Sequence, residues 1–290
     1  MDLKIDKFLV KKLIAQQFPH LCDLPVSPIK KQGWDNRTFR LGDELTVRLP
    51  RDASYADSVQ KEASALAAIG SHLTVEIPVV IAVGKPSEDY PLPWSIRTWI
   101  AGETLEEAKG VDRRALATAL GATLVELRSV PTENGPYAGK HSFFRGYHQS
   151  VYDGEVVEIL NMLGDKIDAA QCLEIWQLAM TSVCIAEPVW FHGDVTVGNI
   201  LVTGNALSAL IDFGTCGIGD PACDFVMAWT YFDTDERQHF RKAVEVDDGT
   251  WQRAKAWALW KALVSLSGLS SPDTNGVHAR ALIEILNEGP

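Results

Sequence analysis

The sequence lacks any apolar run long enough to cross a bilayer, because no eighteen consecutive apolar residues occur in its 290 positions. A signal peptide is also not apparent, since the first residues, MDLKIDKFLVKK, have the charged, amphipathic pattern of a surface helix. We therefore expect a cytoplasmic protein with no membrane partner.

Cysteine is scarce, and its positions follow no pattern. The sequence contains no C-x-x-C pair and no His cluster near any of its five cysteines, which are Cys22, Cys172, Cys184, Cys216 and Cys223. Zinc sites and disulfide frameworks show regular cysteine spacing. We expect these residues to be reduced thiols.

Basic residues are in deficit, with 27 Lys and Arg against 38 Asp and Glu and a net charge of −11. This disfavours a nucleic-acid partner, because phosphate binding needs clustered Lys and Arg. Residues 1–105 contain 13 basic and 13 acidic side chains, whereas residues 106–290 contain 14 and 25. The acidic surplus either maintains solubility or attracts a cationic ligand, and charge alone leaves both interpretations open.

Apolar residues, at 46% of the chain, are sufficient for a substantial core. Segments typical of strands occur at 26–32, 37–41, 45–49, 78–83 and 93–99. Helical patterns follow at 112–130, 155–163, 170–186, 222–243, 250–268 and 277–287. The segment WIAGET (99–104) lies at the transition and is a candidate hinge. We predict an α+β, bilobal protein with a β-rich N-terminal lobe (1–101) and a mainly helical C-terminal lobe (102–290).

The stretch HGDVTVGN (192–199) places an aspartate and an asparagine five positions apart. It leads into ILVTGNALSALIDFG, in which two apolar segments flank a Gly-Asn pair that is typical of a β-hairpin. The start of the first strand of an antiparallel hairpin lies beside the end of the second. We therefore expect Asn199 and Asp212 to be neighbours, with Asp194 in the loop that precedes them.

Three oxygen-bearing side chains at one sheet edge suit phosphoryl transfer. Magnesium binds carboxylate and amide oxygens together with phosphate oxygens, which makes Asn199 and Asp212 candidate metal ligands. Asp194 is a candidate for the base that accepts the proton of the attacking hydroxyl. The protein-kinase motifs H-R-D-x-x-x-x-N and D-F-G have counterparts in this same order, with Gly193 in place of the Arg.

A nucleotide site of this kind also needs a cation for the phosphates. Glu62 falls on the apolar stripe of the helix predicted over 54–70, and a buried carboxylate requires a cationic partner. In the strand ELTVRLP (44–50), Arg48 points away from the apolar face and is the expected partner. The alternative is that Glu62 lies at the edge of the stripe, in solvent.

Other polar and aromatic residues receive structural interpretations. We expect His192 to brace the catalytic loop, and Asp220 and Asp224 to cap the next helix or brace the loop. Four tryptophans with helical spacing are expected in the core: Trp229, Trp251, Trp257 and Trp260.

These motifs resemble the aminoglycoside phosphotransferase family, within the protein-kinase-like fold. HGDVTVGN is similar to its HGDxxxxN catalytic loop, and IDFGTCGIGDPACDF (211–225) to its DFG and GDPxxDF motifs. QGWDNRTFRLGDELTVRLP (32–50) resembles its nucleotide-covering loop and strands, and PWSIRTWIAGE (93–103) its hinge.

The resemblance implies that Asp194 is the catalytic base and that Asn199 and Asp212 hold Mg²⁺. It further implies ATP as co-substrate, with GTP not excluded, and adenine contacts from the backbone around Thr98 and Ile100. Glu62 would pair with the phosphate-binding cation. That cation is Arg48 here, where kinases usually have Lys, and Arg keeps the charge with a different geometry.

The implied reaction is phosphoryl transfer to a hydroxyl of a small, cationic molecule, with an aminoglycoside antibiotic favoured. A macrolide, amino alcohol or sugar acceptor is the alternative, as is a catalytically silent nucleotide-binding module. A peptide acceptor is disfavoured, since a helical pattern follows DFG within about a dozen residues and no A-P-E segment intervenes. We also expect the acidic surplus of residues 106–290 to line the acceptor side of the cleft.

Overall fold

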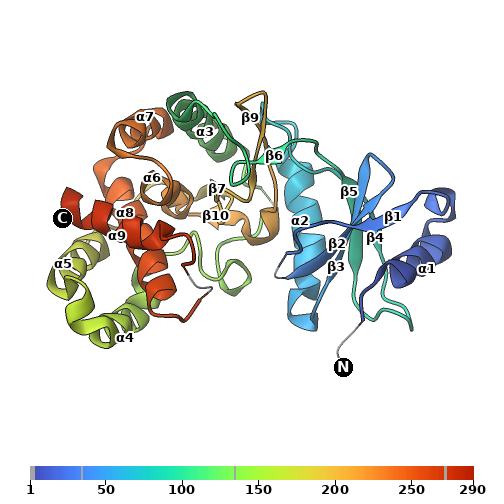
Figure 1. The fold of residues 1–290 in the computed structure, drawn as a ribbon, viewed down its shortest axis with the longest axis horizontal. Coiled ribbons are helices and arrows are strands. Elements are labelled where there is room, and N and C mark those ends of the chain that lie inside the picture. Colours follow the sequence, from blue (N-terminus) through green and yellow to red (C-terminus); the bar gives the residue numbers. More distant parts are fainter. Residues whose placement is uncertain (1–3, 34, 134, 271–272) are drawn as a thin grey trace.

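The structure is a computed structural model that describes residues 4–33, 35–133, 135–270 and 273–290. Its two lobes lie side by side, with the N-terminal sheet in one and most of the helices in the other (Figure 1). This arrangement confirms the predicted α+β, bilobal fold class. Among the helices that the structure describes, none combines the length and the apolar character needed to cross a bilayer.

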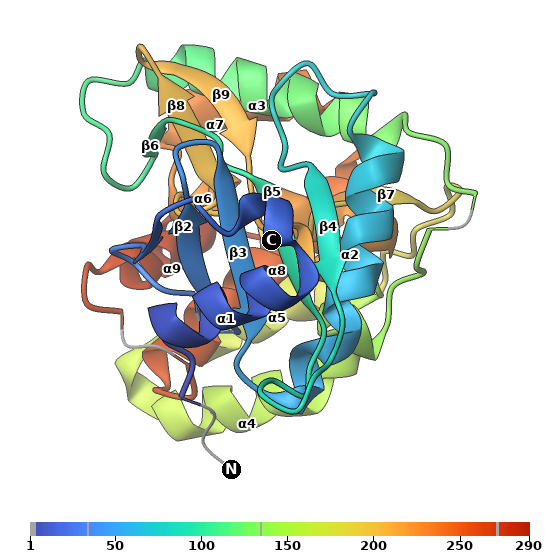
Figure 2. The same cartoon turned by 90° about the vertical axis from the view of Figure 1, so that its right-hand side faces the viewer.

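The N-terminal lobe is built on a five-stranded antiparallel sheet in the order β1-β2-β3-β5-β4. The strands are β1 (Val26–Pro28), β2 (Asn36–Leu41), β3 (Leu45–Pro50), β4 (Val80–Gly84) and β5 (Trp94–Thr98). Helix α1 (Lys7–Gln17) packs Val10 and Leu13 against Val47 of β3, in a core of its own. Helix α2 (Ala56–Ile69) lies between the sheet and the larger lobe (Figures 1 and 2).

Helix α2 belongs to the packing of both lobes. Its apolar residues Ala65, Leu66 and Ile69 are buried in the large hydrophobic core that continues through the C-terminal lobe. Glu62, on the same helix, is only 2% exposed and makes its contacts with the sheet. The position of α2 therefore links the sheet to the helical lobe.

The C-terminal lobe contains seven α-helices in the described part of the chain. They are α3 (Arg113–Arg128), α4 (Asp153–Leu163), α5 (Ala169–Met180), α6 (Met227–Thr230), α7 (Thr234–Val244), α8 (Asp248–Leu266) and α9 (Val277–Glu288). Helix α5 ends six residues before the predicted boundary at 186. The five cysteines are free thiols, as expected.

The helix predicted over 222–243 is wrong as a single element. A 3₁₀ turn (Pro221–Phe225) and the short α6 come first, and α7 then begins after Asp233. The side chain of Asp233 accepts the N–H of Glu236, while the Glu236 carboxylate accepts the N–H of Asp233. This reciprocal capping box starts a new helix within a continuous apolar pattern.

Short strands connect the lobes and hold the catalytic segments. Strands β6 (Glu103–Thr104), β8 (Ile200–Thr203) and β9 (Ala206–Leu210) form one antiparallel sheet, and β7 (Val189–Phe191) pairs with β10 (Gly217–Gly219). The chain crosses between the lobes just before β6, at Gly102, where φ is +151°. This φ favours glycine, and a Cβ there would also be crowded, at 3.2 Å from the carbonyl oxygen of Val202.

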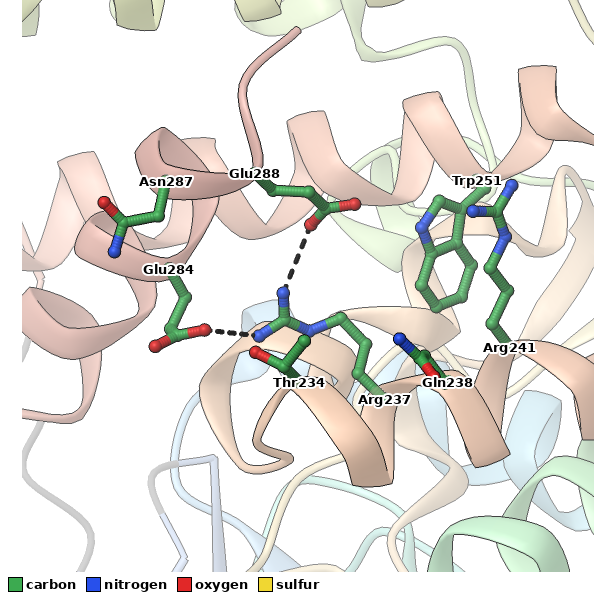
Figure 3. A pocket seen from close by; sticks show the side chains of 8 residues that line it. All are labelled: Thr234, Arg237, Gln238, Arg241, Trp251, Glu284, Asn287 and Glu288. Carbon is green, nitrogen blue, oxygen red and sulfur yellow. Dashed lines mark hydrogen bonds and ion pairs between the residues drawn. The ribbon is translucent and has the colours of Figure 1, made fainter.

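The C-terminal helix is fastened by an arginine. Arg237 of α7 donates to Glu284 (2.8 Å) and to Glu288 (3.2 Å) of α9. These groups line a pocket of about 280 Å³ between α7, α8 and α9 (Figure 3). Trp251 of α8 forms part of its wall. Because the carboxylates of this pocket pair with Arg237, they stabilise the helix packing.

Candidate active site

The catalytic loop connects β7 to β8 and is braced from within. His192 is fully buried; its Nδ1 accepts the N–H of Asp194 (3.1 Å) and its Nε2 donates to the carbonyl oxygen of Ile211 (3.0 Å). The Asp224 carboxylate accepts the N–H groups of His192 and Gly193, both at 2.7 Å. Burial raises the pKa of Asp224. His192 and Asp224 therefore hold the loop, as expected from the sequence.

The backbone conformation of the loop depends on one glycine. Gly193 has φ +82°, and a Cβ there would lie 2.8 Å from the carbonyl oxygen of Thr215. Asp220, in the segment after DFG, accepts the N–H of Ala222 and pairs with Arg253 at 2.5 Å in the core of the lobe. The predicted capping role of Asp220 is confirmed.

The β8–β9 hairpin brings the predicted site residues together. Ile200 pairs with Leu210, and the carbonyl oxygen of Asn199 accepts the N–H of Ile211 (2.9 Å), so Asn199 lies beside Asp212. The side-chain Nδ2 of Asn199 donates to the carboxylate of Asp194 (2.8 Å). Asp194, Asn199 and Asp212 thus converge on one sheet edge, as predicted from the Gly-Asn turn.

The oxygens at this edge suit a magnesium ion. Because its Nδ2 is bonded to Asp194, Asn199 can present Oδ1 to a ligand. Asp212 lies at the edge with a side chain that is 37% exposed and a left-handed backbone (φ +65°), a conformation that Asp adopts more readily than most residues other than glycine. One amide oxygen and one carboxylate fit Mg²⁺, which keeps further positions for phosphate oxygens and water.

Arg48 reaches this edge from the N-terminal lobe. Its Nη2 lies 3.1 Å from Oδ1 of Asp212, and its Nη1 lies 3.3 Å from Oε1 of Glu62. The predicted contact between Arg48 and Glu62 is therefore present, and Glu62 is buried rather than solvated. The guanidinium connects the nucleotide lobe to the candidate metal site.

Glu62 has a second and closer partner that sequence reasoning missed. Arg97 of β5 donates to both of its carboxylate oxygens, at 2.5 and 2.8 Å. Arg97 lies opposite Thr46 in the β3–β5 register, on the same sheet face as Arg48, and its Nε is held by Ser95 (2.9 Å). No sequence motif marks it; the alternation of β5 alone could have pointed to its face.

The charges of this cluster support one another. Burial alone would raise the pKa of Glu62, but Arg97 and Arg48 outweigh it and lower the pKa to about 2. Burial likewise would lower the pKa of Arg48, but the carboxylates of Asp212, Glu62 and Asp35 raise it. Both partners are therefore ionised at neutral pH.

Two further residues near the site were not predicted. Asp35, in the stretch before β2, lies 3.8 Å from Arg48, and burial raises its pKa. Lys61 of α2 donates to the carbonyl oxygen of Gly214 and lies 3.1 Å from Nδ1 of His141. Lys61 thereby joins the N-terminal lobe to the segment that follows Asp212.

The two residues predicted to contact adenine differ in whether their backbone N–H is already hydrogen-bonded. The N–H of Thr98 donates to Val79 (2.9 Å), and its Oγ1 accepts the N–H of Val79 (2.9 Å). Ile100 is 7% exposed and packs with Leu201 and Ala209. Within the described chain, the N–H of Ile100 has no hydrogen-bond partner, so it is the amide that is free to meet a ligand.

A pocket of about 970 Å³ opens beside the catalytic loop. Its walls include Tyr231 and two residues of the loop, Thr196 and Val197. Helix α8 contributes Trp260 and Lys261, and α9 contributes His278. Nζ of Lys261 lies 3.9 Å from Oδ1 of Asp194, so the pocket adjoins the candidate base. This is where an acceptor molecule can approach Asp194.

The acidic excess expected on the acceptor side of the cleft is absent from the described lining of this pocket. Its charged walls contain four carboxylates and four cations: Glu106, Asp233, Asp273, Glu284, Arg113, Arg145, Lys261 and Arg280. Part of the acidic surplus caps helices instead, since Asp112, Asp168 and Asp247 accept backbone N–H groups at helix starts. The surplus is therefore a property of the whole lobe and not of the pocket.

Three of the four tryptophans are buried in the core as predicted, and the fourth, Trp260, packs against the core while partly exposed. Trp229, Trp251 and Trp257 are buried. Trp260 is half-buried in the pocket wall, where its ring stacks on Tyr152 with centroids 4.3 Å apart. The helical period placed Trp260 on α8 correctly but could not show that this part of α8 faces a pocket.

Comparison with known proteins agrees with this geometry. Residues 26–257 match the model of the phosphotransferase enzyme family (APH). An aminoglycoside 3'-phosphotransferase of Escherichia coli is 22% identical over 249 residues, which cover 84% of this chain and 82% of that protein.

Two solved structures illustrate the similarity of fold. The GDP complex of aminoglycoside 2'-phosphotransferase-IIIa has a TM-score of 0.70 at 19% identity and covers 98% of this chain and 99% of its own. The macrolide 2'-phosphotransferase MphH of Brachybacterium faecium has a TM-score of 0.62 at 19% identity, with 96% of each chain covered. At these identities the structures establish the kinase-like fold alone.

Proposed function

Because the chain belongs to the phosphotransferase enzyme family, we propose that it transfers the γ-phosphoryl group of ATP, with Mg²⁺, to a hydroxyl of a small molecule. The observation that carries this proposal is the convergence of Asp194, Asn199 and Asp212 on one sheet edge, with Arg48 reaching the same point from the other lobe. The five free thiols suit the cytoplasm, where disulfides are rare.

The nucleotide would lie between the lobes. Asn199 Oδ1 and the Asp212 carboxylate would hold Mg²⁺, which neutralises phosphate charge when bound. Arg48 would contact the phosphates, held in place by Glu62, while the N–H of Ile100 would meet adenine. Solved relatives in this fold include a GDP complex and an ATP ternary complex, so both nucleotides belong in the test.

Asp194 would act on the acceptor. Its carboxylate accepts the proton of the attacking hydroxyl as the hydroxyl oxygen bonds to the γ-phosphorus. The bond between that phosphorus and the β–γ bridging oxygen breaks, and ADP carries away the electron pair. Asn199 orients the carboxylate through its Nδ2 contact, which fixes the base relative to the metal ligands.

The names of the relatives supply the first acceptors to test. An aminoglycoside acceptor is supported by the curated relative, and a macrolide acceptor by the structural neighbour MphH. The experiment is a screen of aminoglycosides, macrolides, amino alcohols, sugars, sugar acids and sugar phosphates, with Mg²⁺ and either ATP or GTP. The readouts are nucleoside diphosphate release and an acceptor mass increased by one phosphoryl group.

The control in that screen is Asp194→Asn. Phosphorylation of an acceptor by the wild type, lost in Asp194→Asn, supports the proposal. Nucleotide binding without transfer to any acceptor contradicts it and favours a silent nucleotide-binding module.

A further inference from the structure

We propose that Lys261 and Arg145 form an anion-binding subsite in the acceptor pocket, which takes a carboxylate or phosphate group of the acceptor beside Asp194. This inference rests on the proposed function and narrows its acceptor to a hydroxylated molecule that bears an oxyanion.

The carboxylates of the pocket already have partners. Its two glutamates are paired with Lys31 and with Arg237. Its two aspartates accept backbone N–H groups, one from Glu236 at the start of α7 and one from Ala279 near the start of α9. All four carboxylates therefore have partners within the protein and are poorly placed to attract a polycationic acceptor.

Two of the four cations of the pocket also make contacts within the protein. Arg113 pairs with Glu236 at 2.7 Å, and its guanidinium lies over the ring of Tyr231. Arg280 donates to the carbonyl oxygen of Asn275 (3.0 Å). Arg113 is therefore paired with a carboxylate, whereas Arg280 is exposed to solvent.

Lys261 and Arg145 differ from these two. In the described part of the chain, neither side chain donates a hydrogen bond to a protein acceptor. The only carboxylate near Lys261 there is that of Asp194, at 3.9 Å, which is beyond hydrogen-bond reach. The guanidinium of Arg145 has the ring of Phe143 as its nearby group, 5.7 Å from the centroid.

The two cations act on each other. Burial lowers the pKa of Lys261, Asp194 opposes this effect, and the charge of Arg145 lowers the pKa further. His278 also lies within range of these charges. Burial lowers the pKa of His278, and the charge of Lys261 lowers it further. Its Nδ1 is buried without a hydrogen-bond partner among the described residues.

An oxyanion bound in the pocket would compensate the charges of Lys261 and Arg145. It would accept charge-assisted hydrogen bonds from Lys261 and Arg145 and relieve their mutual repulsion. Held there, an acceptor would present a neighbouring hydroxyl to Asp194. A polycationic acceptor, in contrast, would be repelled by Lys261 and Arg145, while the carboxylates of the pocket already have partners within the protein.

The test is calorimetric binding to protein saturated with Mg²⁺ and the non-hydrolysable analogue AMP-PNP, which keeps the probes out of the nucleotide site. The probes are gluconate for a carboxylate and ribose 5-phosphate for a phosphate, each beside its neutral parent, glucose or ribose. We expect one anionic probe to bind at least about tenfold more tightly than its parent. Which probe binds identifies the oxyanion.

The variants separate the subsite from general charge effects. Lys261→Gln and Arg145→Gln should each weaken the anionic probe by roughly 10- to 100-fold, the scale of a charged hydrogen bond, and leave the neutral parent unchanged. Arg114→Gln, which removes a surface cation paired with Asp235 in the same lobe, should bind like wild type. Unchanged affinity for AMP-PNP shows that each variant is folded.

The inference is overturned if neither anionic probe binds better than its parent, or if Lys261→Gln affects anionic and neutral probes equally. Aminoglycoside phosphorylation that is insensitive to Lys261→Gln would also overturn it, while the proposed function would stand. Anionic probes that bind as expected in a protein that phosphorylates nothing would support the subsite and contradict the proposed function.

Discussion

Arg48 occupies the position where kinases usually have a lysine, and its contacts show what the longer, forked side chain achieves. One nitrogen of its guanidinium meets Glu62 at 3.3 Å and another meets Asp212 at 3.1 Å, so a single residue spans both lobes. An ammonium is a compact charge that cannot fork in this way. Because Arg97 also neutralises Glu62, that carboxylate stays paired when Arg48 turns toward a nucleotide.

Glu62 should make the stability of the protein depend on pH. Its pKa is lowered from 4.5 to about 2, so its contribution is fully present above pH 4.5 and is lost as the pH falls toward 2. The lowering corresponds to a stabilisation on the order of 3 kcal/mol. Glu62→Gln should therefore reduce the free energy of unfolding at pH 7, and the gap to wild type should shrink between pH 5 and pH 3.

Urea denaturation at a series of pH values measures this gap. Glu158→Gln, at an exposed position on α4, is the matched control and should track wild type throughout. A gap for Glu62→Gln that stays constant across this window would show that the carboxylate is not held in its charged form by the arginines.

Helix α2 is the element that couples the N-terminal lobe to the candidate metal site. Its apolar face is buried with the C-terminal core, Glu62 meets two strands of the sheet, and Lys61 meets the backbone at Gly214. A shift of α2 would therefore change the positions of Arg48 and of the backbone just after Asp212. Burial lowers the pKa of Lys61, which reflects its position between the lobes.

Lys61→Met should loosen this link. The apparent affinity for Mg²⁺ and kcat/KM for ATP should each fall about tenfold, the scale of one lost charged hydrogen bond. Magnesium titrations of the ATPase or kinase rate measure the effect. Lys11→Met, on the exposed side of α1, is the control and should leave both quantities unchanged. Equal values for the two variants would mean that α2 does not act on the metal site through Lys61.

Elements with local signals could be predicted from the sequence. Gly204 and Asn205 have φ values of +57° and +70°, which a tight hairpin turn requires, and this turn placed Asn199 beside Asp212. The contacts that were missed join distant positions, 35 apart for Arg97 and Glu62 and 153 apart for Lys61 and Gly214. Such pairs depend on how whole elements pack, which no local pattern encodes.

At the scale of the whole molecule, we propose that nucleotide and acceptor bind to different walls of one site. The sheet and α2 supply Arg48 and Glu62, while the C-terminal lobe supplies Asp194 and the wide pocket beside it. We place the boundary between lobes 1–101 and 102–290, where the chain passes Gly102. The net charge of the chain did not indicate the charge of the pocket, because acidic residues lie at helix caps and surface positions rather than in excess along the pocket wall.

We propose that this site transfers a phosphoryl group, with Asp194 as the base and Asp212 as a metal ligand. The most direct measurement compares Asp194→Asn with Asp212→Asn in steady-state rate and in nucleotide affinity, with and without Mg²⁺. Asp194→Asn should lower kcat by roughly a hundredfold or more while Mg-ATP affinity hardly changes, because Asn199 and Asp212 remain. Asp212→Asn should lower both, because one of the few protein ligands of the ion is weakened. Full activity in Asp194→Asn, or loss of Mg-ATP binding in that variant, would contradict the account.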